Sequence, residues 1–237
     1  MSQTKFIQFD DGQRTEILSY VGLESDTALA ISVEAALRKA QSEHPTLPEW
    51  YPLGGRNAAA ISALRIALEV TGSWTRWQHR NLHGVKHLQT GRFIAVHNCC
   101  ERTGLDLADR LPRFMSDRKR SATKSLRDDL QGELDLLIED DGQQDSLDAR
   151  GEVDTPAHLC VYINSETLAT GEAKYEVRAE LLIDGVCNDA GFISARYRLP
   201  VDLEGLVDDL VETGTPNGTM PGDGGVFEAD VSIRKRS

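Results

Sequence analysis

The 237-residue chain carries a formal net charge of −12, with 40% apolar and 27% charged residues, which is ordinary globular usage and excludes a disordered or fibrous chain. Its length allows one large domain or two small ones with a substantial core. No apolar run approaches the roughly 18 residues of a membrane helix, and the N-terminus lacks the apolar stretch of a secretory signal. We therefore expect a soluble cytoplasmic protein with no membrane partner.

The first 140 residues are predicted to be mostly helical. Ser25 or Asp26 can cap a helix that runs to about Ser42, because short polar side chains accept hydrogen bonds from the free amides of a helix start. One face of this helix is apolar and consists of Leu29, Val33, Ala36, Leu37 and Ala40. The other elements expected here are strands at 4–9 and 91–97 and helices at 58–71 (capped by Asn57 and ended by Gly72), 103–115 and 121–139.

The period of the sequence changes to two after an acidic loop at 141–156. Strands are predicted at 158–164, 174–183, 192–199 and 226–235. In the second of these, Tyr175, Val177, Ala179 and Leu181 alternate with charged residues, which is typical of an antiparallel sheet with one solvated face. We predict an α+β fold, in which N-terminal helices pack on one face of a mainly antiparallel sheet in residues 157–237, all within one compact domain.

Charge is unevenly distributed along the chain. Residues 74–127 hold twelve Lys or Arg and four acids, so this basic segment carries +8 and the rest of the chain −20. Such asymmetry indicates an anionic partner. It is also consistent with packing of the basic segment against the acidic parts of the same chain, or with pairing between copies in a homo-oligomer.

Four of the six histidines lie within the basic segment. His79, His83 and His87 are spaced by four and would share one face of a helix, with His97 further on. Histidine is a natural zinc ligand, so these four are candidate metal ligands, although no acid lies between His79 and Asn98 to activate a water. The alternative is a solvated basic face. The sequence identifies no particular cofactor.

Two further patterns suggest catalysis. Cys99 and Cys100 precede Arg102 at the start of the predicted helix at 103–115, where a thiol could be activated, but the Cys-to-Arg spacing does not fit a cysteine phosphatase loop, and buried structural thiols explain the pair equally. Asp154, Glu172 and Lys174 have the residue types of a metal-dependent nuclease. The run of alternating charges after Lys174 is also expected on a solvated sheet face. With no CxxC pair, the four cysteines are expected to be reduced.

Aromatic and cationic residues alternate at the start of the basic segment, a combination that suits stacking on nucleotide rings, although tryptophans three apart are common in helical cores. The candidate residues for binding nucleic acid or a nucleotide are Trp74, Arg76, Trp77, Arg80, Arg102, Arg118, Lys119 and Arg120. The favoured hypothesis is a cytosolic module that binds an anionic partner. The alternatives are a metal-dependent phosphoesterase or nuclease and a self-assembling structural subunit.

Overall fold

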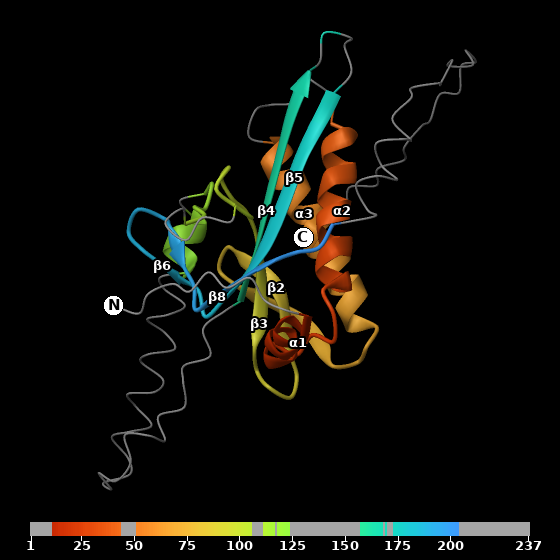
Figure 1. The fold of residues 1–237 in the computed structure, drawn as a ribbon, viewed down its shortest axis with the longest axis vertical. Helices are drawn as coiled ribbons and strands as arrows, with labels where there is room; N and C mark the ends of the chain where they lie inside the picture. The colour runs from red at the N-terminus through yellow and green to blue at the C-terminus, as the bar shows by residue number, and fades with distance from the viewer. Residues whose placement is uncertain are drawn as a thin grey trace, which may run out of the picture.

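The computed structural model describes residues 11–43, 51–105, 111–116, 118–123, 157–167, 169 and 173–203. Its helices are α1 (Asp11–Tyr20), α2 (Thr27–Gln41) and α3 (Tyr51–Glu69), and residues 118–123 are also helical. Its strands are β1 (Trp74–His79), β2 (Leu82–His87), β3 (Phe93–Asn98), β4 (Ala157–Thr167), β5 (Ala173–Ile183), β6 (Val186–Cys187), β7 (Ile193–Ser194) and β8 (Tyr197–Pro200). N-terminal helices pack on a mostly antiparallel sheet, so the predicted fold class is confirmed (Figure 1).

The main sheet has six strands in the order β1-β2-β3-β4-β5-β8. Strands β3 and β4 are parallel, and the other neighbouring pairs are antiparallel. Parallel neighbours need a long connection, and here residues 99–156 form it. Strands β6 and β7 pair separately as a small ribbon.

The helices α2 and α3 cover one face of this sheet. All five residues of the predicted apolar face of α2 are buried. Across the interface, Ala179 and Leu181 of β5 belong to the same apolar core and Val177 packs against it. The predicted facing of β5 is therefore confirmed, since a shift by one residue would have turned these side chains to the other face.

Helix α3 begins at Tyr51, seven residues before the predicted start. Asn57 is therefore not its N-cap, and its side-chain Oδ1 instead accepts a hydrogen bond of 2.9 Å from Lys119 Nζ. One side of this helix faces solvent, because Ile66 is 65% exposed and Val70, just after the helix, is 79% exposed.

The opposite face of the sheet is solvated only in part: Lys174 and Glu176 of β5 are exposed as predicted, but the end of this face near Glu180 is covered. Glu180 and Arg198 are fully buried there, because residues 99–105, 111–116, 118–123 and 186–195 form a layer over it (Figure 1). The predicted strand at 192–199 is in fact interrupted. Ile193 and Ala195 pack into this second layer, whereas Leu199 belongs to the core under the helices.

One local prediction in the basic segment is wrong, and one segment had no definite prediction. The segment 74–89, whose histidines would share one face if it were helical, is a β-hairpin in which β1 and β2 are joined at Arg80 and Asn81. In the range of the helix expected at 103–115, residues 103–105 form a turn and residues 113–114 form isolated bridges to Cys99 and Phe192. The strands expected at 4–9 and 226–235, the loop at 141–156 and most of the helix at 121–139 lie outside the described residues.

Candidate anion-binding pocket

Three arginines of the second layer line one pocket. The pocket has a volume of about 350 Å³, which is within the range of small-molecule sites. Its lining residues are Cys100, Glu101, Arg102, Arg113, Phe114, Met115, Arg120 and Phe192. Glu101 is the single acid among them, so the lining carries a net charge of +2.

Backbone hydrogen bonds join the three segments that form this pocket. Cys100 N donates to Arg113 O at 3.1 Å, and Phe114 N donates to Gly191 O at 3.1 Å. Ile193 N donates to Pro112 O at 2.9 Å. Because these hydrogen bonds hold each segment to its neighbour, the backbone that carries the pocket residues is fixed.

Aromatic contacts position two of the arginines. The guanidinium carbons of Arg102 and Arg113 lie 5.2 and 5.7 Å from the centre of the Phe192 ring, within the range of cation–π attraction. Neither forms an ion pair with a carboxylate in the described part of the chain. Arg120 lies over Gly191, where an added Cβ would come within 2.2 Å of Arg120 Cδ. Gly191 is therefore the residue that allows Arg120 to approach the main chain.

A buried ion pair supports the turn that carries Arg102. Arg198 Nε donates to Glu180 Oε2 at 2.8 Å, and both side chains are essentially inaccessible to solvent. Glu180 Oε1 also accepts a hydrogen bond of 2.9 Å from Gly104 N. The turn that follows Arg102 is thus anchored to β5 by a carboxylate that is itself held by β8.

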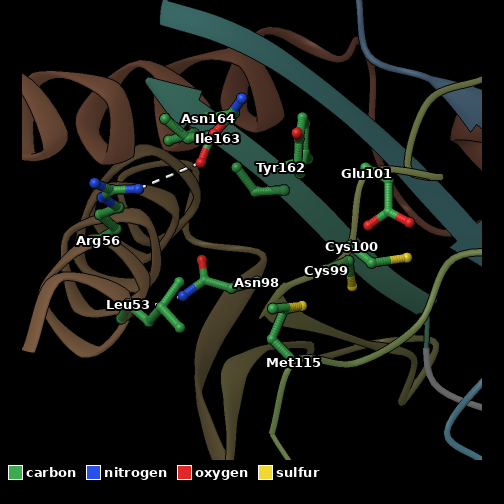
Figure 2. A pocket seen from close by; sticks show the side chains of 11 residues that line it. Leu53, Arg56, Asn98, Cys99, Cys100, Glu101, Met115, Tyr162, Ile163 and Asn164 are labelled. Atoms are coloured by element: carbon green, nitrogen blue, oxygen red, sulfur yellow. Dashed lines mark hydrogen bonds between the residues drawn. The ribbon is translucent and has the colours of Figure 1, made fainter. Parts of the chain in front are cut away.

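A second pocket adjoins the first and shares Cys100, Glu101 and Met115 with it (Figure 2). Its volume is about 200 Å³. Arg56 of α3 points toward it but donates to Glu43 at 2.7 Å and to Ile163 O at 3.3 Å, so its charge is already balanced. Asn98 Nδ2 donates to Leu53 O at 2.5 Å. The lining of this pocket is therefore closer to neutral than that of the first pocket, which contains Arg102, Arg113 and Arg120 and is called the arginine pocket below.

A group of buried titratable side chains lies on the same face of the sheet. His97 Nε2 and His158 Nδ1 are hydrogen-bonded at 2.9 Å, and both rings are fully buried. Burial lowers the pKa of His158 to about 4 and that of His97 well below its usual value. Burial also lowers the pKa of Lys119 to about 8. Lys119 Nζ donates to Asn57 Oδ1 and to Val96 O, at 2.9 and 2.8 Å.

The structure disperses the predicted nucleic-acid-binding residues. Trp74 is buried against His87, and Trp77 stacks on Phe93 with ring centres 4.4 Å apart. Neither tryptophan is therefore presented as an open stacking platform. Among the cations, Arg76 pairs with Glu69, Arg80 and Arg118 are exposed, and Lys119 is turned inward. Only Arg102 and Arg120 of the predicted set line the arginine pocket.

The four candidate metal-ligating histidines do not converge. The hairpin register places His79 on one face of the sheet and His83 and His87 on the other. His97 is buried beside His158 instead. Among the described residues, no group of three or more His, Cys, Asp or Glu side chains is placed to hold a metal ion. Of the nuclease candidates, Asp154 and Glu172 lie outside the described residues, and Lys174 is exposed at the start of β5.

Arg113 and Phe192 are among the pocket residues that sequence reasoning did not single out. Arg113 was counted within the basic segment but not singled out, and Phe192 had no signal because it lies about 80 residues further along the chain. No protein-family model, curated protein or solved structure matches this chain. No helix in the described part of the chain is both long and apolar enough to cross a membrane.

Proposed function

We propose that this protein is a binding module for a small phosphate-bearing anion, of the nucleotide class, and that the arginine pocket is its binding site. The observation that carries the proposal is the convergence of Arg102, Arg113 and Arg120 on one pocket, in which Glu101 is the single acid among the described lining residues. Guanidinium groups bind phosphate through paired hydrogen bonds and are weakly hydrated, so they suit this role better than lysines.

The size of the pocket favours a small ligand over a nucleic-acid strand. A volume of about 350 Å³ accommodates a phosphate group and part of a nucleoside. The other cations predicted to contact nucleic acid, including Arg76 and Arg80 of the hairpin, do not line this pocket. A polymer bound along the whole basic segment is therefore the less favoured form of the proposal.

Cation–π contacts supply preorganisation. Because Arg102 and Arg113 already rest on Phe192, less side-chain freedom is lost when an anion binds. We also propose that the protein occupies a reducing compartment such as the cytosol, because its four cysteines are free thiols and three of them are buried.

Calorimetry on the full chain tests the proposal with ATP, AMP, inorganic phosphate and adenosine. We expect the phosphate-bearing ligands to bind, with affinity that falls as salt rises, and adenosine not to bind. Arg102→Gln and Arg113→Gln are expected to weaken binding, whereas the control Arg38→Gln, which changes an exposed arginine of α2, is not. Equal binding of adenosine and AMP, or no binding by any phosphate at low salt, would contradict the proposal.

The same measurement separates the alternatives. Binding of a single-stranded oligonucleotide that is insensitive to Arg113→Gln would favour a polymer site on the hairpin. Mass measured at low and high salt tests self-assembly, because pairing of opposite charges between copies weakens as salt screens it. That Asp154, Glu172 and Lys174 support a metal-dependent nuclease activity remains an untested prediction.

A further inference from the structure

The second pocket, shown in Figure 2 and called the Asn98 pocket here, lies next to the proposed binding site. Cys100, Glu101 and Met115 line both this pocket and the arginine pocket. Its volume of about 200 Å³ is smaller than that of most complete small-molecule sites, and much of its wall is apolar, formed by Leu53, Val161 and Ile163. It therefore suits one part of a ligand whose remainder occupies the arginine pocket.

One pair of chain segments carries residues of both pockets. Met115 N donates to Asn98 O at 3.2 Å, and Cys100 N donates to Arg113 O at 3.1 Å, so the two segments run antiparallel. Asn98 is therefore opposite Met115, and Arg113 is its diagonal neighbour at about 7–8 Å. Opposite residues of an antiparallel pair share a face, and side chains alternate along each strand. Asn98 and Arg113 thus project from the same face, where one ligand can contact both.

The Asn98 pocket lies where β3 ends and β4 continues. The parallel register of the two strands ends at Asn98 and Val161, whereas β4 runs on to Thr167. On the edge of β4 that is left open, Ile163 O accepts a hydrogen bond of 3.3 Å from Arg56 Nη1. The N–H of a strand residue points to the same edge as its C=O, and no acceptor for Ile163 N is found within the described part of the chain. The pocket therefore offers a main-chain donor.

Two side chains of the Asn98 pocket offer hydrogen-bond acceptors. Asn98 Nδ2 donates to Leu53 O at 2.5 Å, and Oδ1 is turned away from Leu53 and toward Ile163 (Figure 2). Glu101 is exposed at the boundary between the two pockets and pairs with no cation among the residues that the structure describes. An acceptor that meets another acceptor loses its hydrogen bond to water without a replacement. These oxygens therefore favour ligand groups that donate.

We propose, on the basis of the function proposed above, that the two pockets form one site for a nucleoside phosphate whose base carries an exocyclic amino group, as adenine and cytosine do. The phosphate lies in the arginine pocket, and Glu101 at the boundary accepts hydrogen bonds from the ribose hydroxyls. The base enters the Asn98 pocket, where its amino group donates to Asn98 Oδ1 and the adjacent ring nitrogen accepts from Ile163 N–H.

Calorimetry on the full wild-type chain tests this inference with ligands that share one phosphate. AMP should bind at least about tenfold tighter than purine riboside 5′-monophosphate, which lacks only the amino group, because one hydrogen bond is worth about that factor. IMP should bind more weakly still, since in the same orientation its keto oxygen faces Asn98 Oδ1 and its ring N–H faces Ile163 N–H. Ribose 5-phosphate, which has no base, should also bind more weakly than AMP.

A variant of Asn98 assigns the effect to this pocket. Asn98→Ala should bind AMP about as weakly as the wild type binds purine riboside 5′-monophosphate, whereas its affinity for ribose 5-phosphate should be unchanged. The unchanged affinity for ribose 5-phosphate also shows that the variant is folded. Asn81→Ala, which changes an exposed asparagine in the turn between β1 and β2, is the matched control and should bind AMP like the wild type.

The wild-type ligand series decides the inference even where Asn98→Ala fails to fold. Equal affinities for AMP, purine riboside 5′-monophosphate and ribose 5-phosphate would overturn it. If Arg113→Gln still weakened the binding of all three, the arginine pocket would stand as a phosphate site without a base site beside it. If none of the phosphates bound at low salt, the proposed function itself would fall. The two failures are therefore distinguishable.

Discussion

Removing the charge of Glu180 should destabilise the protein strongly. Glu180 and Arg198 lose nearly all contact with water in the folded state, so Glu180→Gln removes the carboxylate charge that faces the buried Arg198 guanidinium. Breaking a buried pair from one side costs about 3–5 kcal/mol. Glutamine can still accept from Gly104 N, where the carboxylate accepts at 2.9 Å, so we expect a loss near the lower end, about 3 kcal/mol of unfolding free energy.

An exposed ion pair of the same type is the control. Arg76 Nε lies 2.8 Å from Glu69 Oε1, the same distance as in the buried pair, but the Arg76 side chain is 71% exposed. Water compensates for a lost partner at such a site. Arg76→Met should therefore leave stability unchanged within experimental error, and the contrast between the two pairs isolates the effect of burial.

Urea unfolding of four proteins completes a double-mutant cycle. Arg198→Met alone leaves a buried carboxylate, whereas Glu180→Gln with Arg198→Met removes both charges. The double variant should therefore lose less stability than the sum of the single variants, by more than about 1 kcal/mol. Additive effects, or single losses as small as that of Arg76→Met, would refute the view that a buried charge pair holds the second layer.

Two further outcomes follow from the same packing. Because the pKa of His158 is lowered to about 4, the unfolded chain binds a proton between pH 6.5 and 4 that the folded chain does not. The free energy of unfolding should therefore be highest above pH 6.5 and fall as the pH drops toward 4, by about 3 kcal/mol for His158 alone. Urea unfolding of His158→Gln should show a smaller decline over the same pH range. Gly84→Ala should destabilise the protein severely, because the added Cβ would lie 1.8 Å from Ile94 O. In the control Gly54→Ala in α3, the added Cβ meets nothing within 4 Å, and helix propensity should raise the stability by up to about 1 kcal/mol. Thermal melts of both variants check this, and equal melting temperatures would contradict it.

The sequence by itself determined the helices and long strands whose apolar patterns are local. The face of α2, the interior position of β3 and the facing of β5 follow from periods of 3.6 and 2, and the α+β class follows from their order. The hairpin at 74–87 was not predicted, because neither a period of two nor a period of 3.6 is clear in this segment. Its turn at Arg80 and Asn81 has no glycine to signal it, although Arg80 adopts a φ of 50°.

Only the tertiary structure decided the second layer and the pocket within it. A strand such as β5 alternates apolar and charged residues whether its charged face meets water or protein, so the burial of Glu180 could not be seen without its partner Arg198. Similarly, the burial of Cys99 and Cys160 in one cluster depends on a parallel pairing of β3 with β4 across more than fifty residues of chain. Local pattern fixes which face a side chain takes, but which segment covers that face is set by long-range pairing and charge compensation.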